Sequence, residues 1–112
     1  MANQRVARAL ESMRSPDPAI RAQGFDFLRE HADAYVGDLA DAFGEERDDE
    51  LRCLLLELVA EARSPGALAV LAGQLDSDDE SLRFWAVRGL EMLDSAEARQ
   101  ALRHARVNGW IA

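Results

Sequence analysis

The sequence predicts an all-α protein, a right-handed α-α superhelix of about seven helices arranged as three helix pairs and a closing helix. Ala and Leu dominate the composition, Val, Ile and aromatic residues are sparse and Thr is absent, which favours helices over strands. One apolar pattern recurs every 31 residues, a period typical of stacked supersecondary units. At 112 residues the chain is expected to form a single repeat domain over residues 1–112.

The opening helix precedes the first copy of the pattern. Its apolar residues recur at helical spacing and are Val6, Ala9, Leu10 and Met13. This stripe predicts an amphipathic helix that pairs with the helix following it.

Three longer helices follow the 31-residue period. They are "DPAIRAQGFDFL" from Asp17, "DDELRCLLLELV" from Asp48 and "DESLRFWAVRGL" from Asp79. The columns predicted to face the core are 20/51/82, 24/55/86, 27/58/89 and 28/59/90. Each Asp is expected at the start of its helix, and an Arg four residues later allows an i,i+4 ion pair (Arg21, Arg52 and Arg83).

Shorter helices are expected between the longer ones. One apolar stripe contains Val36, Leu39, Ala40 and Phe43, and the next contains Leu68, Leu71 and Leu75. The pair Ser64–Pro65 is a cap followed by Pro at the first helical position. Capping-box spacing occurs at Ser77 with Glu80, and at Asp94 with Glu97 before the closing helix of residues 94–107.

The near-continuous apolar run "LRCLLLELV" from Leu51 is explained by its place in the middle repeat. Neighbouring repeats are expected to cover two sides of this helix, and its own partner covers a third. An isolated helix in water would not need so many apolar sides.

These helices resemble HEAT repeats, specifically the short subclass of the phycobilisome bilin lyases. The matching positions follow the pattern Asp, apolar-Arg, small or apolar, Leu or Val, and are Asp17, Ile20, Arg21, Gly24 and Leu28; Asp48, Leu51, Arg52, Leu55 and Val59; Asp79, Leu82, Arg83, Ala86 and Leu90. The resemblance implies a structural role for Asp17, Arg21, Asp48, Arg52, Asp79 and Arg83, which would tie the turns of adjacent repeats together. Leu55 is larger, and Gly24 smaller, than the Ala typical of the family, which indicates a diverged natural sequence.

The charge and cysteine content narrow the function classes. A net charge of −8 and a pI near 4.7 disfavour nucleic acid and anionic membranes as partners and favour a basic protein. One cysteine, Cys53, implies no oxidising compartment, and the first 15 residues lack the apolar segment of a signal peptide or membrane span. Cytoplasmic residence is therefore expected.

No enzyme signature stands out in the sequence. The HEAT-like deoxyhypusine hydroxylase has His-Glu dipeptides that bind iron, whereas neither His31 nor His104 precedes Glu. Cys53 has no base among its sequence neighbours, and one Cys and two His far apart do not make a zinc site. We therefore expect no catalytic residue, no metal and no cofactor.

Columns of the longer helices that lie opposite the core define a candidate face for a partner. Its members are Asp26, Glu30, Glu57, Glu61, Phe84, Trp85, Arg88 and Met92. The four acids form a strip over two repeats, and Phe84, Trp85 and Met92 add an apolar region. Two alternatives stay open: the strip is a solvated face, and Phe84 and Trp85 pack against the closing helix with Trp110 covering the end of the stack.

Three functions follow from this pattern. The first is a non-catalytic protein-interaction module that binds a basic partner, in the manner of an inhibitor or immunity protein. The second, implied by the resemblance to bilin lyases, is an accessory or scaffold that holds a small ligand. The third is a structural protein that self-associates through the ends of its repeats.

Overall fold

The computed structural model describes residues 3–112, and within them the chain forms seven α-helices and one short 3-10 helix, with no strand. Met1 and Ala2 of the predicted domain lie outside the described residues. The elements are α1 (Gln4–Met13), α2 (Pro18–Glu30), α3 (Val36–Glu45), α4 (Asp49–Glu61), η1 (Pro65–Ala67), α5 (Leu68–Ala72), α6 (Glu80–Leu93) and α7 (Ala96–Val107). The predicted three pairs and closing helix are confirmed.

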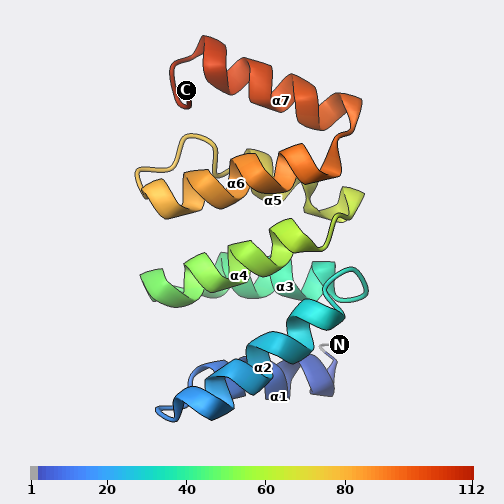
Figure 1. The fold of residues 1–112 in the computed structure, drawn as a ribbon, viewed down its shortest axis with the longest axis vertical. Helices are drawn as coiled ribbons and strands as arrows, with labels where there is room; N and C mark the ends of the chain where they lie inside the picture. Colours follow the sequence, from blue (N-terminus) through green and yellow to red (C-terminus); the bar gives the residue numbers. More distant parts are fainter. Residues whose placement is uncertain (1–2) are drawn as a thin grey trace.

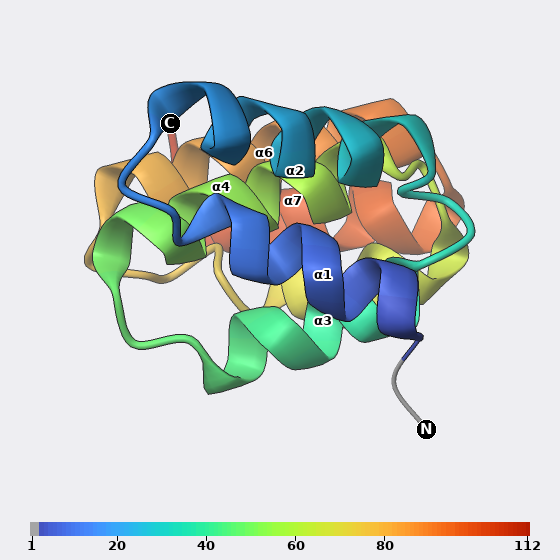
Figure 2. The ribbon, with the colours of Figure 1, turned by 90° about the horizontal axis from the view of Figure 1, so that it is seen from below.

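The helices stack in two layers along the long axis of a molecule that measures 42 × 25 × 22 Å (Figure 1). α1 packs on α2, α3 on α4, and α5 on α6. Viewed along the stack, α2, α4 and α6 lie on one side, while α1 and α3 lie on the other (Figure 2). α7 packs against α5 and α6 at the C-terminal end.

The helix starts follow from short polar side chains. Asp17, Asp48 and Asp79 each occupy the N-cap of their helix and accept a hydrogen bond from a backbone N–H of the first turn. Ser64 caps η1 with Pro65 just inside, as predicted. Leu75 lies beyond the end of α5, in the turn that follows it, although its side chain is buried.

Both expected capping boxes are corrected by the structure. The N-cap of α6 is Asp79, and Ser77 instead accepts a hydrogen bond from the Asp79 N–H. The N-cap of α7 is Ser95, because Asp94 adopts a left-handed conformation (φ 47°) that ends α6. In both cases the residue nearest the first helical turn provides the cap.

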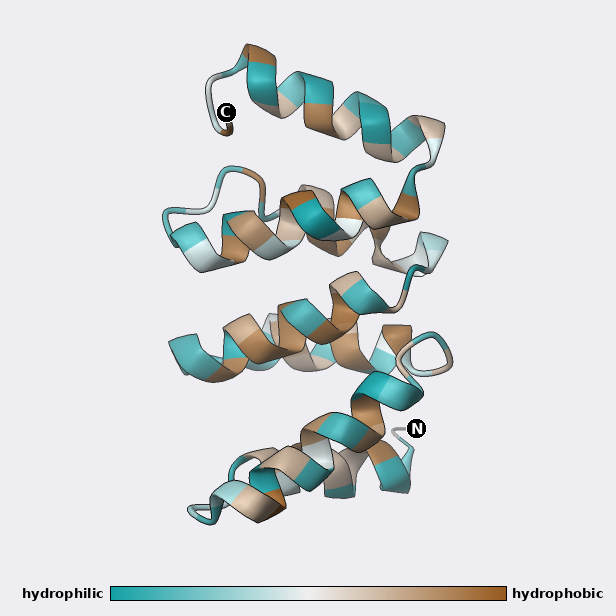
Figure 3. Cartoon of the chain, viewed as in Figure 1, coloured by the Kyte–Doolittle hydropathy of each residue, from teal (hydrophilic) through white to brown (hydrophobic). Residues whose placement is uncertain are grey.

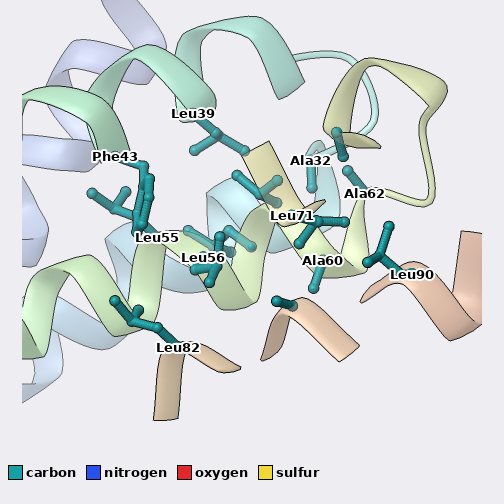
Figure 4. Close-up of a cluster of buried hydrophobic side chains, with 14 of the residues drawn as sticks. Ala32, Leu39, Phe43, Leu55, Leu56, Ala60, Ala62, Leu71, Leu82 and Leu90 are labelled. Carbon is teal, nitrogen blue, oxygen red and sulfur yellow. The ribbon is translucent and has the colours of Figure 1, made fainter. Parts of the chain in front are cut away.

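The core is an apolar cluster with members from α1 to α7. Figure 4 shows its middle part, around Leu56 and Leu71. α4 buries five residues, whereas α2 buries Gly24 and Leu28 only. Hydrophobic residues accordingly make up much of α4 beyond its first turn (Figure 3). The predicted three-sided coverage of α4 explains this difference. No polar or charged residue is buried among residues 3–112.

One predicted core position is wrong. Ile20 is 41% exposed, whereas its equivalents Leu51 and Leu82 are half-buried and buried. Ile20 lies in the first turn of α2, at the end of the stack, beside a shallow surface depression lined by α1 and the α1–α2 turn. No preceding repeat covers it there.

Candidate functional site

The candidate face is a surface of the α2, α4 and α6 layer, to which each of these helices contributes. Asp26, Glu30, Phe84 and Arg88 are exposed, and Glu57, Glu61, Trp85 and Met92 are half-buried. The eight residues therefore divide into four that a partner can reach directly and four that also take part in packing.

Glu57 and Glu61 are the electrostatic centre of the acidic strip. Glu61 forms an ion pair with Arg29 of α2 (2.9 Å between Arg29 Nε and Glu61 Oε2). Burial raises the pKa of the Glu57 carboxyl, and the nearby Glu61 charge raises this pKa further, against the lowering effect of Arg29. A cation placed beside Glu57 would relieve both effects, so this part of the face favours a positively charged ligand group.

Trp85 lies at the contact between α4 and α6. Its ring is half-buried against the core and packs edge-on against Phe84, with ring centroids 5.1 Å apart. On its α4 side, Trp85 lies by Cys53. Burial and the charges of Asp79 and Glu57 raise the pKa of the Cys53 thiol. Hydrogen bonds with Ser81 and Trp85 lower this pKa by less. Trp85 therefore fills the space between repeats, and a raised pKa keeps Cys53 a thiol.

Phe84, which packs against Trp85, is itself 56% exposed. It lines a groove of about 660 Å³ between α6 and the chain after α7, together with Val87, Trp110 and Ile111. Trp110 packs edge-on against His104, with centroids 5.3 Å apart. In the alternative given above, Phe84 packs against the closing helix. In the structure an open groove separates Phe84 from the segment that follows α7.

The Arg column connects each longer helix to the chain that precedes it, and among residues 3–112 no Arg of this column forms the i,i+4 ion pair with its capping Asp. Arg52 donates hydrogen bonds to the carbonyls of Phe43 and Glu46, and its guanidinium lies 4.1 Å from the centroid of the Phe43 ring. Arg21 donates to the Ser15 and Pro16 carbonyls, and Arg83 to that of Ser77. These bonds hold the loop that precedes each capped helix. They lie within each repeat, whereas the resemblance implies bonds between the turns of adjacent repeats.

A groove between α2 and α4 did not follow from the sequence analysis. Its volume is about 700 Å³, and it is lined by Met13, Arg14, Ser15, Pro16, Arg21, Ala22, Phe25, Asp26, Asp48, Glu50, Leu51 and Leu54. The two helices converge toward their C-terminal ends and diverge toward their N-termini (Figure 1). A sequence signal was available, because Leu54 and Ala22 are the smaller equivalents of Trp85 and Cys53 at the next repeat contact.

The excess negative charge is concentrated in the middle of the chain. Residues 33–80 contain fourteen acids and three Arg, a net charge of −11, whereas residues 1–32 and 81–112 have net charges of +1 and +2. α3, α4 and the loops before α4 and α6 supply all of these acids except Asp33 and Glu80. The acidic character is therefore a regional property and not an average over the surface.

The described part of the chain contains no set of side chains that could ligate a metal ion. Residues 3–112 contain no group of three or more His, Cys, Asp or Glu side chains placed to hold a metal ion. His31 caps the C-terminus of α2 and packs on Phe27 (4.8 Å between centroids) and Tyr35 (6.1 Å). These contacts give the His31 ring a packing role.

Residues 36–109, two thirds of the chain, match the family model described as HEAT repeats. The chain belongs to the HEAT-repeat family. The match covers the second and third helix pairs and α7, and the bilin-lyase subclass stays a prediction. A comparison with curated proteins gives no match.

HEAT repeats commonly mediate protein–protein interaction or scaffolding, and most proteins built from them are not catalysts. In helix-pair solenoids one layer of helices forms an extended binding surface. In this chain α2, α4 and α6 form one layer of the stack and α1 and α3 lie on the other side (Figure 2). No helix among residues 3–112 has the length and apolar character needed to cross a membrane.

Proposed function

We propose that this HEAT-repeat domain is a non-catalytic binding module for a basic protein, which contacts the candidate face on α2, α4 and α6. The observation that supports a basic partner is the net charge of −11 on residues 33–80, to which the candidate face contributes Glu57 and Glu61. Such a field steers a cationic protein to the acidic region and speeds association at low salt. Neutralisation of a basic enzyme or toxin, as by an inhibitor or immunity protein, is the sharper form of the proposal.

The side chains of the face suit this role. Asp26 and Glu30 offer exposed carboxylates, and Glu57 offers a half-buried one. Burial and the charge of Glu61 raise the pKa of the Glu57 carboxyl. Cys53 is a free cysteine and the chain has no second one to pair with, which agrees with residence in a reducing compartment, so the proposal places the domain in the cytoplasm.

Affinity capture with the immobilised domain, followed by titration of the purified partner, tests the function. Bound proteins from the source lysate are identified by mass spectrometry, and the dissociation constant of the main partner is measured at several salt concentrations. We expect a basic protein whose affinity falls steeply as salt rises, because exposed charges are screened over about 10 Å at 0.1 M.

A pair of charge-reversed variants locates the site. Asp26→Arg/Glu57→Arg changes the candidate face, and Asp41→Arg/Glu45→Arg makes the same change in net charge on exposed positions of α3. The first variant should weaken binding at least ten-fold and the second less than three-fold. Equal losses would mean that net charge alone attracts the partner, and an unchanged affinity in the first variant would place the site elsewhere.

A further inference from the structure

The groove between α2 and α4 is a gap left by one missing large side chain. At the contact between α4 and α6, Trp85 and Cys53 fill the space between the helices. The residues 31 positions earlier are Leu54 and Ala22, and both line the groove. An indole at one contact is thus replaced at the other by a smaller side chain and an open volume of about 700 Å³.

The floor of this groove is apolar and comes from three helices. Phe25 of α2, Leu51 and Leu54 of α4, and Met13 at the end of α1 form it. Phe25, Leu51 and Leu54 are half-buried against the core and line the groove with the surface that stays exposed. A volume in the range of about 300 to 1,000 Å³ with an apolar lining is typical of sites that hold a specific ligand group.

The rim of the groove bears a carboxylate on each wall. Asp26 lies on the α2 wall and Glu50 on the α4 wall, and among the residues that the structure describes neither forms an ion pair. The two Arg residues of the lining are engaged: Arg14 pairs with Glu46, and Arg21 donates to two loop carbonyls. The unpaired charges that face a ligand are therefore negative.

We propose that this groove binds a segment of the basic partner in which one large apolar side chain is flanked by Arg or Lys. The apolar side chain occupies the position that Trp85 fills at the next repeat contact, and the flanking cations meet Asp26 and Glu50. Aromatic and Arg side chains are the usual anchors of protein interfaces, which agrees with this pairing. This inference rests on the proposed function and names the part of the partner that is recognised.

Three labelled octapeptides test the groove directly by nuclear magnetic resonance titration and fluorescence anisotropy. The first has a central Trp with two Arg on each side, the second replaces Trp with Ser, and the third replaces every Arg with Glu. We expect the first to bind with a dissociation constant at least ten-fold below those of the other two. Its addition should shift the amide signals of Ala22, Phe25, Asp26, Leu51 and Leu54.

The Leu54→Trp variant fills the groove with the residue that the third repeat uses. It should raise the dissociation constant of the first peptide at least ten-fold, while the thermal midpoint stays equal or rises because packing between α2 and α4 improves. Asp26→Asn/Glu50→Gln should raise the dissociation constant of the first peptide at least five-fold. Glu45→Gln on α3, an exposed control, should raise this constant less than two-fold. Unchanged binding by a folded Leu54→Trp variant would overturn the proposal, as would signal shifts confined to other helices in the unmodified protein.

Failure of this inference is distinguishable from failure of the proposed function. If a basic partner is lost on Asp26→Arg/Glu57→Arg substitution but retained by Leu54→Trp, the face stands and the groove is overturned. If the first peptide binds the groove while no basic protein depends on the face, the groove stands and the proposed function is overturned.

Discussion

The two contacts between successive repeats differ in how closely their helices approach. α6 packs along α4, whereas α2 contacts α4 over a much shorter stretch and diverges from it toward the N-termini (Figure 1). The same 31-residue pattern specifies both contacts, so the difference must come from the side chains at equivalent positions.

Two equivalent pairs differ in size between the contacts. At the close contact, Gly89 of α6 meets Ala60 of α4, and a Cβ on Gly89 would lie 2.8 Å from the Ala60 Cβ. The equivalents at the open contact are Leu58 and Arg29, and Arg29 forms an ion pair with Glu61 near the C-terminal ends of both helices. The small pair lets the backbones of α4 and α6 approach closely. α2 and α4 converge near Arg29, and the gap between them lies in their N-terminal halves, where Ala22 and Leu54 take the places of Cys53 and Trp85.

Gly89→Leu gives the close contact the residue of the open one, and we expect it to have the largest effect. Because Ala60 and Leu71 already lie within 3 Å of the added Cβ, α6 must move away from both α4 and α5. The free energy of unfolding should fall by more than about 3 kcal/mol. Urea denaturation followed by circular dichroism measures the change.

Gly44→Ala is the matched control for this substitution. Gly44 is in α3 with no atom within 4 Å of an added Cβ, so the methyl group meets no neighbour. Its reduced unfolded-state entropy should raise stability by about 0.5 kcal/mol. A loss in both variants would show that backbone effects, and not the α4–α6 distance, dominate at Gly89.

Trp85→Leu converts the filled contact into a copy of the open one, with a smaller expected loss. The half-buried indole packs against the core and beside Cys53, and Leu replaces only part of it. Stability should fall by about 2 kcal/mol, within the range for large-to-small core substitutions. Thermal denaturation gives the value, and a new groove beside Cys53 should make the thiol react faster with a maleimide. An unchanged reaction rate would mean that the helices closed over the gap.

The architecture was predictable from the sequence because its determinants are local and repeat. Asp17, Asp48 and Asp79 start helices wherever they occur, and the apolar columns give each helix a buried side. The prediction was wrong at Ile20 because a column gives the direction of a side chain and not the neighbour that covers it.

The candidate face was predictable only in part, for a related reason. Column positions placed its eight residues on α2, α4 and α6, but the distance between helices depends on pairs such as Gly89 with Ala60. That distance decides that Trp85 is an inter-repeat filler and that Leu54 lines a groove. A comparison of residue sizes between equivalent positions would have indicated both.

Glu57→Gln tests the electrostatics of α4 beside Glu61 and Arg29, with an effect below those of the packing changes. Burial and Glu61 raise the folded-state pKa of Glu57, so the folded protein holds this proton more tightly than the unfolded chain. The free energy of unfolding therefore falls as the pH rises above 4.5 and through the raised pKa, because the charged form of Glu57 is disfavoured in the folded protein. The Gln variant should be more stable than the unmodified protein at pH 7, and the difference should disappear below pH 4.5, as measured by urea denaturation at each pH.

Glu46→Gln provides a comparison of opposite sign. Burial alone would raise the pKa of Glu46, but hydrogen bonds from the Asp48 and Arg47 N–H groups and the Arg14 guanidinium outweigh it and lower that pKa. Its charge therefore stabilises the folded protein above pH 4.5, and this contribution is lost as the pH falls through the lowered pKa. Glu46→Gln should destabilise at pH 7. Parallel pH profiles for the two variants would contradict the assigned causes.

The Arg29–Glu61 ion pair is the direct link between α2 and α4, and we expect its coupling energy to be the smallest effect. The Arg29 side chain is 57% exposed and that of Glu61 is 22% exposed, so water screens the pair. A double-mutant cycle with Arg29→Ala and Glu61→Ala should give a coupling of about 0.5 kcal/mol that declines in 1 M NaCl. A coupling several times larger, insensitive to salt, would mean that this pair holds the two repeats together.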